Sequence, residues 1–471
     1  MRGRHGVVRP GFACLFVGAD LVLGGQLTSQ LVPPDEHPWI EEFGCTARYR
    51  EFRNRVRSRL AGAANPGGGW VSRLCHDPRV AVHVLDDMLN PHLSSGRLIV
   101  SRETMLVSFS EPEGLFEVRG RELKVEAQFW LDATEMGDLI AAANLDWVIG
   151  AESREETAEP HALEGQAEPE AIQAITWCAA LEHRPGEDHR IDRPDDYERW
   201  AAYEPPHWTG RLFSLTFPNV RTGEPQTLPA MGDFSWFSYR QIIPPPHPVT
   251  CLNWPQNDQM VRPYTGSNSP SDQAALDESR RITQSLLYWL QSECDLPGLR
   301  FSPEVAGTRD GLAMAPYIRE SRRLRAMRTL SELEVGAQCN PGLSKMREIP
   351  DSCGIGAYRI DLHPRANGRP TVDIDALPFQ IPLGCLVPRT SSRVIAAGKC
   401  LGATHVANGC TRLHPVEWNV GEAAGILAAW CLSNQIEPQD ATSDPALVGK
   451  IQDELRRDGI ELEWPDGVHP L

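Results

Sequence analysis

Two histidines and two arginines in the last third of the chain carry side chains suited to proton transfer and anion binding: His363, His405, Arg319 and Arg412. Histidine has the ordinary pKa nearest neutrality, so either imidazole is a candidate general acid or base. A guanidinium is permanently charged and offers fixed donors, so Arg319 is a candidate for binding negative charge on a substrate, such as a carboxylate. For each of the four, a structural role in hydrogen bonds or salt bridges is the alternative.

The elements that must position two of these side chains fall within residues 381–430. There, the apolar run at 394–397 ends at Gly398, which is typical of a central parallel strand whose carboxyl end opens at a site. The small residues that follow, Gly409 among them, allow close approach of the backbone to another group. We therefore expect a buried strand, a loop of small residues and a helix in immediate succession.

The helix that closes this stretch has a predicted start and a predicted binding role. Thr411 or His414 is the expected N-cap, with Pro415 in the first turn, where a helix tolerates proline. From Gly421 onward the helix carries small residues, so it can lie close to a neighbouring strand. Its free backbone N–H groups would face an anion. The alternative is a plain strand-loop-helix packing unit.

The remaining patterns predict one β-rich unit, two helices and one linker. Short runs of period two between residues 97 and 131 predict a hairpin or a three-stranded antiparallel unit. Apolar residues at helical spacing predict a helix over 49–60 and another over 271–293, the second capped by Ser271 or Asp272. Residues 151–170 are rich in Glu and Ala with little apolar periodicity, so we expect an exposed linker or loop there.

Composition excludes several classes of function. A chain of 471 residues with 41% hydrophobic content can bury a large core and suggests two connected domains. A net charge of −17 and a pI near 5.3 argue against nucleic-acid or anionic-membrane partners. The twelve cysteines contain no C-x-x-C pair, so no metal site is indicated, and reduced thiols fit a cytoplasmic protein. Asp20 interrupts the apolar run near the N-terminus, which argues against a secretory signal.

Several segments together resemble the FAD-dependent oxidoreductase family of the glutathione-reductase-like superfamily, which also includes fumarate reductase-type flavoproteins. In chain order, the matching segments are GGQLTSQ at 24–30, DATEMGD at 132–138, YIRESRR at 317–323, AGKC at 397–400, GATH at 402–405, GCTR at 409–412 and GEAAG at 421–425. No single motif decides the resemblance, and their joint order carries it.

The resemblance implies an α/β fold in which a Rossmann-like FAD/NAD(P)-binding domain encloses an inserted mixed α+β substrate domain. The FAD-binding domain is implied in two parts, 1–150 and 301–435, and the first part contains an antiparallel meander at 97–131. The substrate or cap domain is implied at 151–300, and a C-terminal tail follows at 436–471. The implied cofactor is FAD, and the implied reaction is hydride transfer between a small-molecule substrate and the flavin. The resemblance places His405, His363 and Arg412 near the flavin, with Arg319 facing its charge or that of the substrate. The implied cofactor-binding residues are Gly24, Gly25, Gln26, Thr134, Gly137, Asp138, Gly398, Gly409, Thr411 and Gly421.

The N-terminal sequence departs from the family pattern. Members begin with a strand and G-x-G-x-x-G, followed some twenty residues later by an acidic residue that holds the adenosine ribose. Neither is present upstream of Gly24, because Gly18 occupies the expected acidic position and Asp20 is displaced from it. We therefore expect an N-terminally incomplete FAD-binding domain. Two alternatives stay open: a flavin-free remnant or binding protein from a truncated gene, and a secreted polysaccharide-acting protein.

Overall fold

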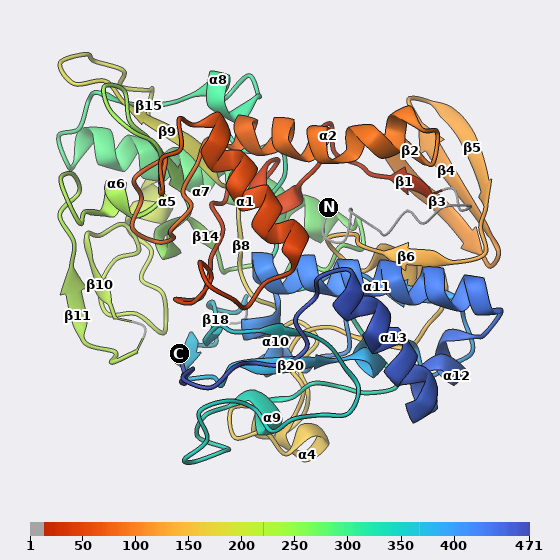
Figure 1. Cartoon of the computed structure of the whole chain (residues 1–471). Coiled ribbons are helices and arrows are strands. Elements are labelled where there is room, and N and C mark those ends of the chain that lie inside the picture. The colour runs from red at the N-terminus through yellow and green to blue at the C-terminus, as the bar shows by residue number, and fades with distance from the viewer. Residues whose placement is uncertain (1–13, 220, 367) are drawn as a thin grey trace.

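The structure is a computed structural model that describes residues 14–219, 221–366 and 368–471. The described chain is mixed α/β and contains many small sheets. Figure 1 shows α5 (Tyr197–Ala201), α6 (Trp236–Tyr239) and α7 (Pro270–Ser292) at one side of the molecule, and α11 (His414–Asn434), α12 (Pro438–Ser443) and α13 (Pro445–Arg457) at the other. The remaining helices are α1 (Ala47–Arg59), α2 (Pro78–Ser94), α3 (Asp138–Ala142), α4 (Arg154–Thr157), α8 (Pro303–Ala306), α9 (Glu332–Val335) and α10 (His405–Thr411).

Two pairs of strands run parallel within the described ranges. β1 (Cys14–Val17) pairs with β2 (Leu98–Ser101), and β6 (Trp130–Asp132) pairs with β21 (Val394–Ala396). The strand predicted at 394–397 is therefore confirmed, and its partner comes from far earlier in the chain. Because the N–H of Ala397 donates to the carbonyl oxygen of Asp132 over 2.8 Å, the loop that follows β21 lies beside the turn that follows β6.

The other sheets are antiparallel. β3 (Thr104–Ser110), β4 (Glu113–Val118) and β5 (Arg121–Glu126) form the three-stranded unit that the period-two pattern predicts. A four-stranded sheet has the order β12 (Gln241–Ile243), β13 (Val249–Leu252), β9 (Ala179–His183), β15 (Leu299–Phe301). The two-stranded pairs are β7 (Trp147–Val148) with β16 (Arg323–Leu324), β8 (Ile175–Thr176) with β14 (Asp258–Gln259), β10 (Thr216–Pro218) with β11 (Pro225–Thr227), β17 (Ser352–Gly356) with β20 (Phe379–Pro382), and β18 (Ile360–Leu362) with β19 (Val372–Ile374).

Two predicted helices are confirmed, one of them with a different N-cap. α1 buries the apolar face that its sequence spacing predicts. α7 also buries its predicted stripe, but Ser269 is its N-cap, because the Ser269 side chain accepts from the N–H of Asp272. The prediction of Ser271 or Asp272 as the cap was wrong. Pro270 has no N–H and fits the first helical position, so the helix begins there and Ser269 caps it.

The helix predicted after residue 411 is preceded by a short helix that the sequence did not predict. α10 begins after Thr404, whose side chain accepts from the N–H of Ala407. The long helix α11 then starts after Leu413, which offers no side-chain cap, so neither Thr411 nor His414 is the N-cap. The first-turn position of Pro415 is confirmed.

Residues 151–170 form only in part the exposed linker or loop that their composition predicts, because many of them are exposed but several are buried. The segment contains α4, whose start is fixed by a capping box between Ser153 and Glu156. Glu152, Glu159 and Leu163 are buried. Composition misleads here because the buried carboxylates bond to residues far away in the sequence, which local patterns do not reveal.

Two large apolar clusters make up most of the core. One combines residues from 116–145 with residues from 324–462 and includes β21 and much of α11. The other draws mainly on 174–317 and includes β9, β13 and the apolar face of α7. The chain therefore builds one core from two segments that flank the middle of its sequence and one mainly from that middle. The exact domain boundaries stay a prediction.

Further properties of the described residues concern membranes and thiols. No helix in the described ranges combines the length and the hydropathy that crossing a bilayer would need. The twelve cysteines are free thiols, and nine of them are buried. Burial raises the pKa of Cys75 and Cys431 to about 12, so these thiols stay protonated and act as small core residues.

Candidate functional site

Three of the four predicted catalytic residues, Arg319, His363 and Arg412, belong to one ionic network. Arg319 Nη2 lies 3.1 Å from Asp258 Oδ1, and His363 Nδ1 lies 2.6 Å from Asp258 Oδ2. Arg412 Nη2 donates to Asp361 Oδ2 over 3.0 Å, and His363 Nε2 lies 3.7 Å from the same oxygen. His363 therefore lies between two aspartates, each of which also contacts an arginine.

Short strands hold these side chains in place. Asp258 begins β14, which pairs with β8 in a register that sets Asp258 opposite Thr176. Arg319 Nη1 donates to Thr176 Oγ1 over 2.8 Å and to the carbonyl oxygen of Ala174 over 2.7 Å. The pairing of β8 with β14 thus brings Arg319 and its carboxylate partner together, while His363 follows the end of β18.

Burial and opposite charge set the ionisation of this network. Burial would raise the pKa of Asp258, but the charge of Arg319 and the hydrogen bond with His363 lower it to about 2. Burial also opposes the ionisation of Asp361, but the charges of His363 and Arg412 outweigh it and lower the pKa of Asp361. Both aspartates are therefore carboxylates near neutral pH. A carboxylate only accepts hydrogen bonds, so the His363 Nδ1 carries the hydrogen that it shares with Asp258.

Solvent reaches the network through two of its members. The side chains of Arg319, Asp258 and Arg412 are at most 2% exposed, whereas those of His363 and Asp361 are 20% and 21% exposed. A general acid or base must lie within reach of the proton that it moves. His363 and Asp361 are therefore the members of this network that a bound molecule could reach.

His405 lies in a second network. Its Nδ1 is 3.1 Å from Glu320 Oε1, and Arg323 donates to the same oxygen. Glu152 accepts from the backbone N–H of His405 over 2.9 Å and from Arg323 over 3.1 Å. Burial would raise the pKa of Glu320, but His405 and Arg323 lower it to about 2. His405 is buried, so it is less accessible than His363.

The side chain of Gln173 joins the two networks. Its Nε2 donates to Asn408 Oδ1 over 3.0 Å, in the same helix as His405, and its Oε1 accepts from the backbone N–H of His363 over 3.2 Å. Its own backbone N–H donates to Glu320 Oε2 over 3.1 Å. One buried amide therefore links the surroundings of all four predicted catalytic residues, whose catalytic roles stay a prediction.

Three predicted cofactor-binding residues lie in one buried loop. Gly24 and Gly25 have φ values of +123° and +55°, in the region that favours glycine. Gln26 Nε2 lies 3.4 Å from the carbonyl oxygen of Arg412 and 3.4 Å from Glu417 Oε1. The loop at 24–26 therefore contacts the junction of α10 and α11, which also carries the predicted residue Thr411.

Three more of the predicted residues form the turn after β6, and protein contacts hold that turn together. Thr134 Oγ1 accepts from the N–H of Asp138 over 2.7 Å and donates to Asp132 Oδ1 over 2.7 Å. Gly137 has a φ of +67° and precedes α3, and Asp138 pairs with Arg322 at 3.1 Å. Burial and the charge of Asp132 raise the pKa of Asp138 to about 6. A role for this turn in cofactor binding stays a prediction.

The last three predicted glycines have different surroundings. A Cβ on Gly398 would lie 3.9 Å from Glu417 Oε2, an ordinary contact, so this backbone has room beside it. A Cβ on Gly409 would lie 2.9 Å from the backbone nitrogen of Asp361, so packing of α10 against β18 alone requires glycine there. Gly421 lies in the buried part of α11.

Several buried polar atoms around these loops have no partner among the described residues: both polar side-chain atoms of Gln30, Thr411 Oγ1, Arg412 Nε, Asn408 Nδ2 and His405 Nε2. Most buried polar groups in folded proteins bond to protein or to ordered water, so a cluster of unpaired ones needs an explanation. The atoms include donors and acceptors. They fit a bound group that both donates and accepts hydrogen bonds.

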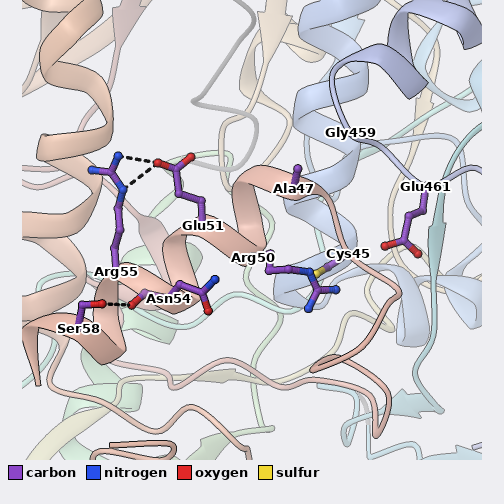
Figure 2. Close-up of a pocket in the computed structure, with 9 residues that line it drawn as sticks. All are labelled: Cys45, Ala47, Arg50, Glu51, Asn54, Arg55, Ser58, Gly459 and Glu461. Carbon is purple, nitrogen blue, oxygen red and sulfur yellow. Dashed lines mark hydrogen bonds and ion pairs between the residues drawn. The ribbon is translucent and has the colours of Figure 1, made fainter. Parts of the chain in front are cut away.

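A cavity of about 440 Å³ lies along α1 and is separate from this region. Figure 2 shows its lining: Cys45, Ala47, Arg50, Glu51, Asn54, Arg55, Ser58, Gly459 and Glu461. Arg55 pairs with Glu51 at 2.5 Å, and Ser58 donates to the carbonyl oxygen of Asn54, so neighbouring residues already bind much of its polar lining. The lining contains none of the predicted site residues. Within the ranges that the structure describes, no group of His, Cys, Asp and Glu has the arrangement of a metal site.

The catalytic candidates chosen from the sequence did not include Asp258, Asp361 or Gln173. Asp361 lies two residues before His363 on β18, which is a weak local signal that the two side chains are neighbours. Asp258 and Gln173 reach the site only through pairing and packing of distant segments. Their roles therefore become visible only in the folded chain.

Comparison with known proteins identifies the family of the chain. No curated protein and no solved structure matches it. The model of the family described as FAD dependent oxidoreductase matches residues 6–455, which is nearly the whole chain and includes every predicted site residue. That family implies a Rossmann-like FAD-binding fold and FAD as the cofactor. The resemblance seen in the sequence is confirmed, and the chain belongs to the FAD-dependent oxidoreductase family.

Proposed function

We propose that the chain is an FAD-dependent oxidoreductase that transfers a hydride between a small-molecule substrate and the flavin. The observation that carries the proposal is the network of Arg319, His363 and Arg412 beside the buried loop at 24–26, within a chain of this family. FAD, when bound, supplies the two-electron chemistry that amino-acid side chains lack. The protein then has to bind and orient the flavin and the substrate, and to exchange protons with the substrate.

The residues of the site fit the polar ring end of FAD. The unpaired side chains of Gln30 and Thr411 offer donors and acceptors to such a ring. The loop at 24–26 and Gly398 would allow its close approach to the backbone. Binding by Thr134, Gly137, Asp138, Gly409 and Gly421, predicted from the resemblance, belongs to the same proposal.

His363 is the proposed acid or base. Asp258 holds its Nδ1–H, which leaves Nε2 to take a proton from the substrate or to return one. Arg319 and Arg412 keep their positive charge at the site, although each is balanced by an aspartate. Because His405 is buried against Glu320, we propose that it holds α10 in position. It also stays one of the candidate catalytic residues.

The cellular context that we propose follows from composition and thiols. Twelve free cysteines support a reducing compartment such as the cytoplasm. The net charge of −17 supports a small-molecule substrate over a nucleic-acid or membrane partner. The same reducing setting argues against the secreted polysaccharide-acting alternative.

The test is the visible absorption spectrum of the purified chain, before and after incubation with FAD and removal of the free cofactor. We expect the spectrum of a bound, oxidised flavin, and its loss under anaerobic conditions with a substrate from a panel of small alcohols, amines and carboxylates. His363→Gln should keep the flavin spectrum but slow its loss, whereas His189→Gln, at a half-buried histidine whose ring contacts Glu187, should match the parent chain. A chain that stays colourless after incubation with FAD would support the flavin-free alternative and overturn the proposal.

A further inference from the structure

Phe234 combines two properties that are rarely found together in a large apolar residue. Its φ is +49°, in the left-handed region that bulky side chains avoid, and it is 74% exposed. An exposed side chain gains little from burial that would offset such backbone strain. Strained residues persist where the surroundings impose them and gather at functional sites. The ring of Phe234 therefore needs an explanation other than core packing.

A second exposed aromatic ring lies beside it. Trp70 is 41% exposed, and its ring centroid is 6.2 Å from that of Phe234, with the planes tilted by 56°. Trp70 Nε1 donates to Ser238 Oγ over 3.2 Å, and the N–H of Val71 donates to the carbonyl oxygen of Tyr239 over 2.9 Å. The Trp70 loop is therefore tied to α6, which holds the indole in a fixed position.

The pair continues inward as a series of aromatic contacts. The centroids of Trp70 and Tyr239 are 4.4 Å apart, and those of Tyr239 and Trp254 are 4.9 Å apart. Asn253 precedes Trp254 and contacts Arg319 through its Oδ1 at 3.3 Å. The exposed rings are thus the outer end of a series whose inner end meets the ionic network of Arg319 and His363.

We propose that Phe234 and Trp70 form a platform that binds the aromatic ring of a small molecule, the substrate class of the site proposed above. Successive rings in the series are tilted, which is the arrangement that aromatic pairs prefer, so a further planar ring extends it. Two rings offer too little area for a stable protein partner, and their continuity with the network points to a ligand of that site. The inference rests on the proposed function.

Benzyl alcohol is the probe, because it carries a planar ring and no charge. Its binding to the purified full chain is measured by saturation-transfer NMR, beside cyclohexylmethanol as a non-planar control and methyl β-glucoside as a sugar ring. We expect saturable binding of benzyl alcohol, weaker binding of cyclohexylmethanol and none of the glucoside. Trp70→Ala should weaken binding about threefold to tenfold. Trp147→Ala should leave it unchanged, because Trp147 is comparably exposed at 38% but lies under Arg322.

Phe234→Asn separates a binding role from a structural one. Asparagine tolerates the left-handed conformation, so this variant should raise the Tm while it weakens binding of benzyl alcohol. A lowered Tm with unchanged binding would mean that the ring is structural and would overturn the proposal. Absence of benzyl alcohol binding, or binding of the glucoside in its place, would also overturn it. The flavin spectrum of the same preparations tests the proposed function separately, since the NMR measurement needs no flavin.

Discussion

Glu159 is a buried carboxyl group whose ionisation should lower the stability of the fold near neutral pH. Its Oε1 accepts from Thr404 Oγ1 over 2.5 Å and from the N–H of Glu332 over 2.7 Å, while its Oε2 has no partner among the described residues. Burial, with a smaller contribution from the charge of Glu152, raises its pKa from 4.5 to about 7. The folded protein therefore holds this proton more tightly than the unfolded chain does.

The sign of the effect on stability follows from this difference. The stabilising contribution of the protonated group is fully present below pH 4.5, is lost as the pH rises, and is gone above about pH 7. A shift of this size corresponds to a loss of about 3 kcal/mol across that window. Glu159→Gln keeps a carbonyl acceptor for Thr404 and stays neutral at every pH. It should match the parent chain near pH 4 and exceed its free energy of unfolding by about 3 kcal/mol near pH 8.

The measurement is urea unfolding followed by tryptophan fluorescence, at several values of pH between those limits. Glu155→Gln is the matched control, because it removes an exposed carboxylate from the same segment. It should change the free energy of unfolding by less than about 0.5 kcal/mol at any pH. The reasoning is refuted if the curves of stability against pH for the parent chain and Glu159→Gln run parallel. Parallel curves would mean that Glu159 titrates alike in the folded and unfolded chain.

Three further substitutions test the packing of the site by the same unfolding measurement. Asp258→Asn should lower the free energy of unfolding by about 3 kcal/mol or more, because it leaves the Arg319 guanidinium buried without its carboxylate; a neutral outcome would contradict the pairing. Gln173→Leu should cost about 2 kcal/mol, since two buried partners lose their hydrogen bonds. Gln173→Glu should restore only the bond from the backbone N–H of His363, because a carboxylate oxygen can accept it. Gly409→Ala should cost about 1–3 kcal/mol, because its Cβ would lie 2.9 Å from the backbone nitrogen of Asp361; an unchanged free energy of unfolding would show that α10 is not packed so closely.

Local patterns predicted the elements whose signal lies in neighbouring residues. The face of α1, the stripe of α7 and the meander of β3 to β5 follow from apolar periodicity, and the strand β21 follows from a short apolar run. The N-cap of α7 was misplaced although Ser269-Pro270 is a readable start signal, because several Ser and Asp residues compete for that role.

Long-range pairing was beyond local patterns. Glu152 and Glu159 lie in a segment whose composition is that of a linker, yet each meets partners such as Arg323 and Thr404 that lie far along the chain. The family resemblance and the residue types together named Arg319, His363 and Arg412 as candidates, but the contact of Asp258 with the first two becomes visible only through strand pairing. Candidate chemistry is thus readable from sequence, whereas the partners that set charge are not.

The contacts of the network restrict proton exchange by His363 to one of its two ring nitrogens. Arg319 and Arg412 offset Asp258 and Asp361, so the network is neutral when the imidazole is neutral and gains one positive charge when it is protonated. Asp258, with its pKa near 2, stays ionised and keeps the hydrogen on Nδ1, so only Nε2 can change its protonation. Asp361 Oδ2, which accepts from Arg412, lies 3.7 Å from that atom. The proposed acid or base therefore acts at the edge of the network formed by His363 and Asp361, whose side chains are 20% and 21% exposed.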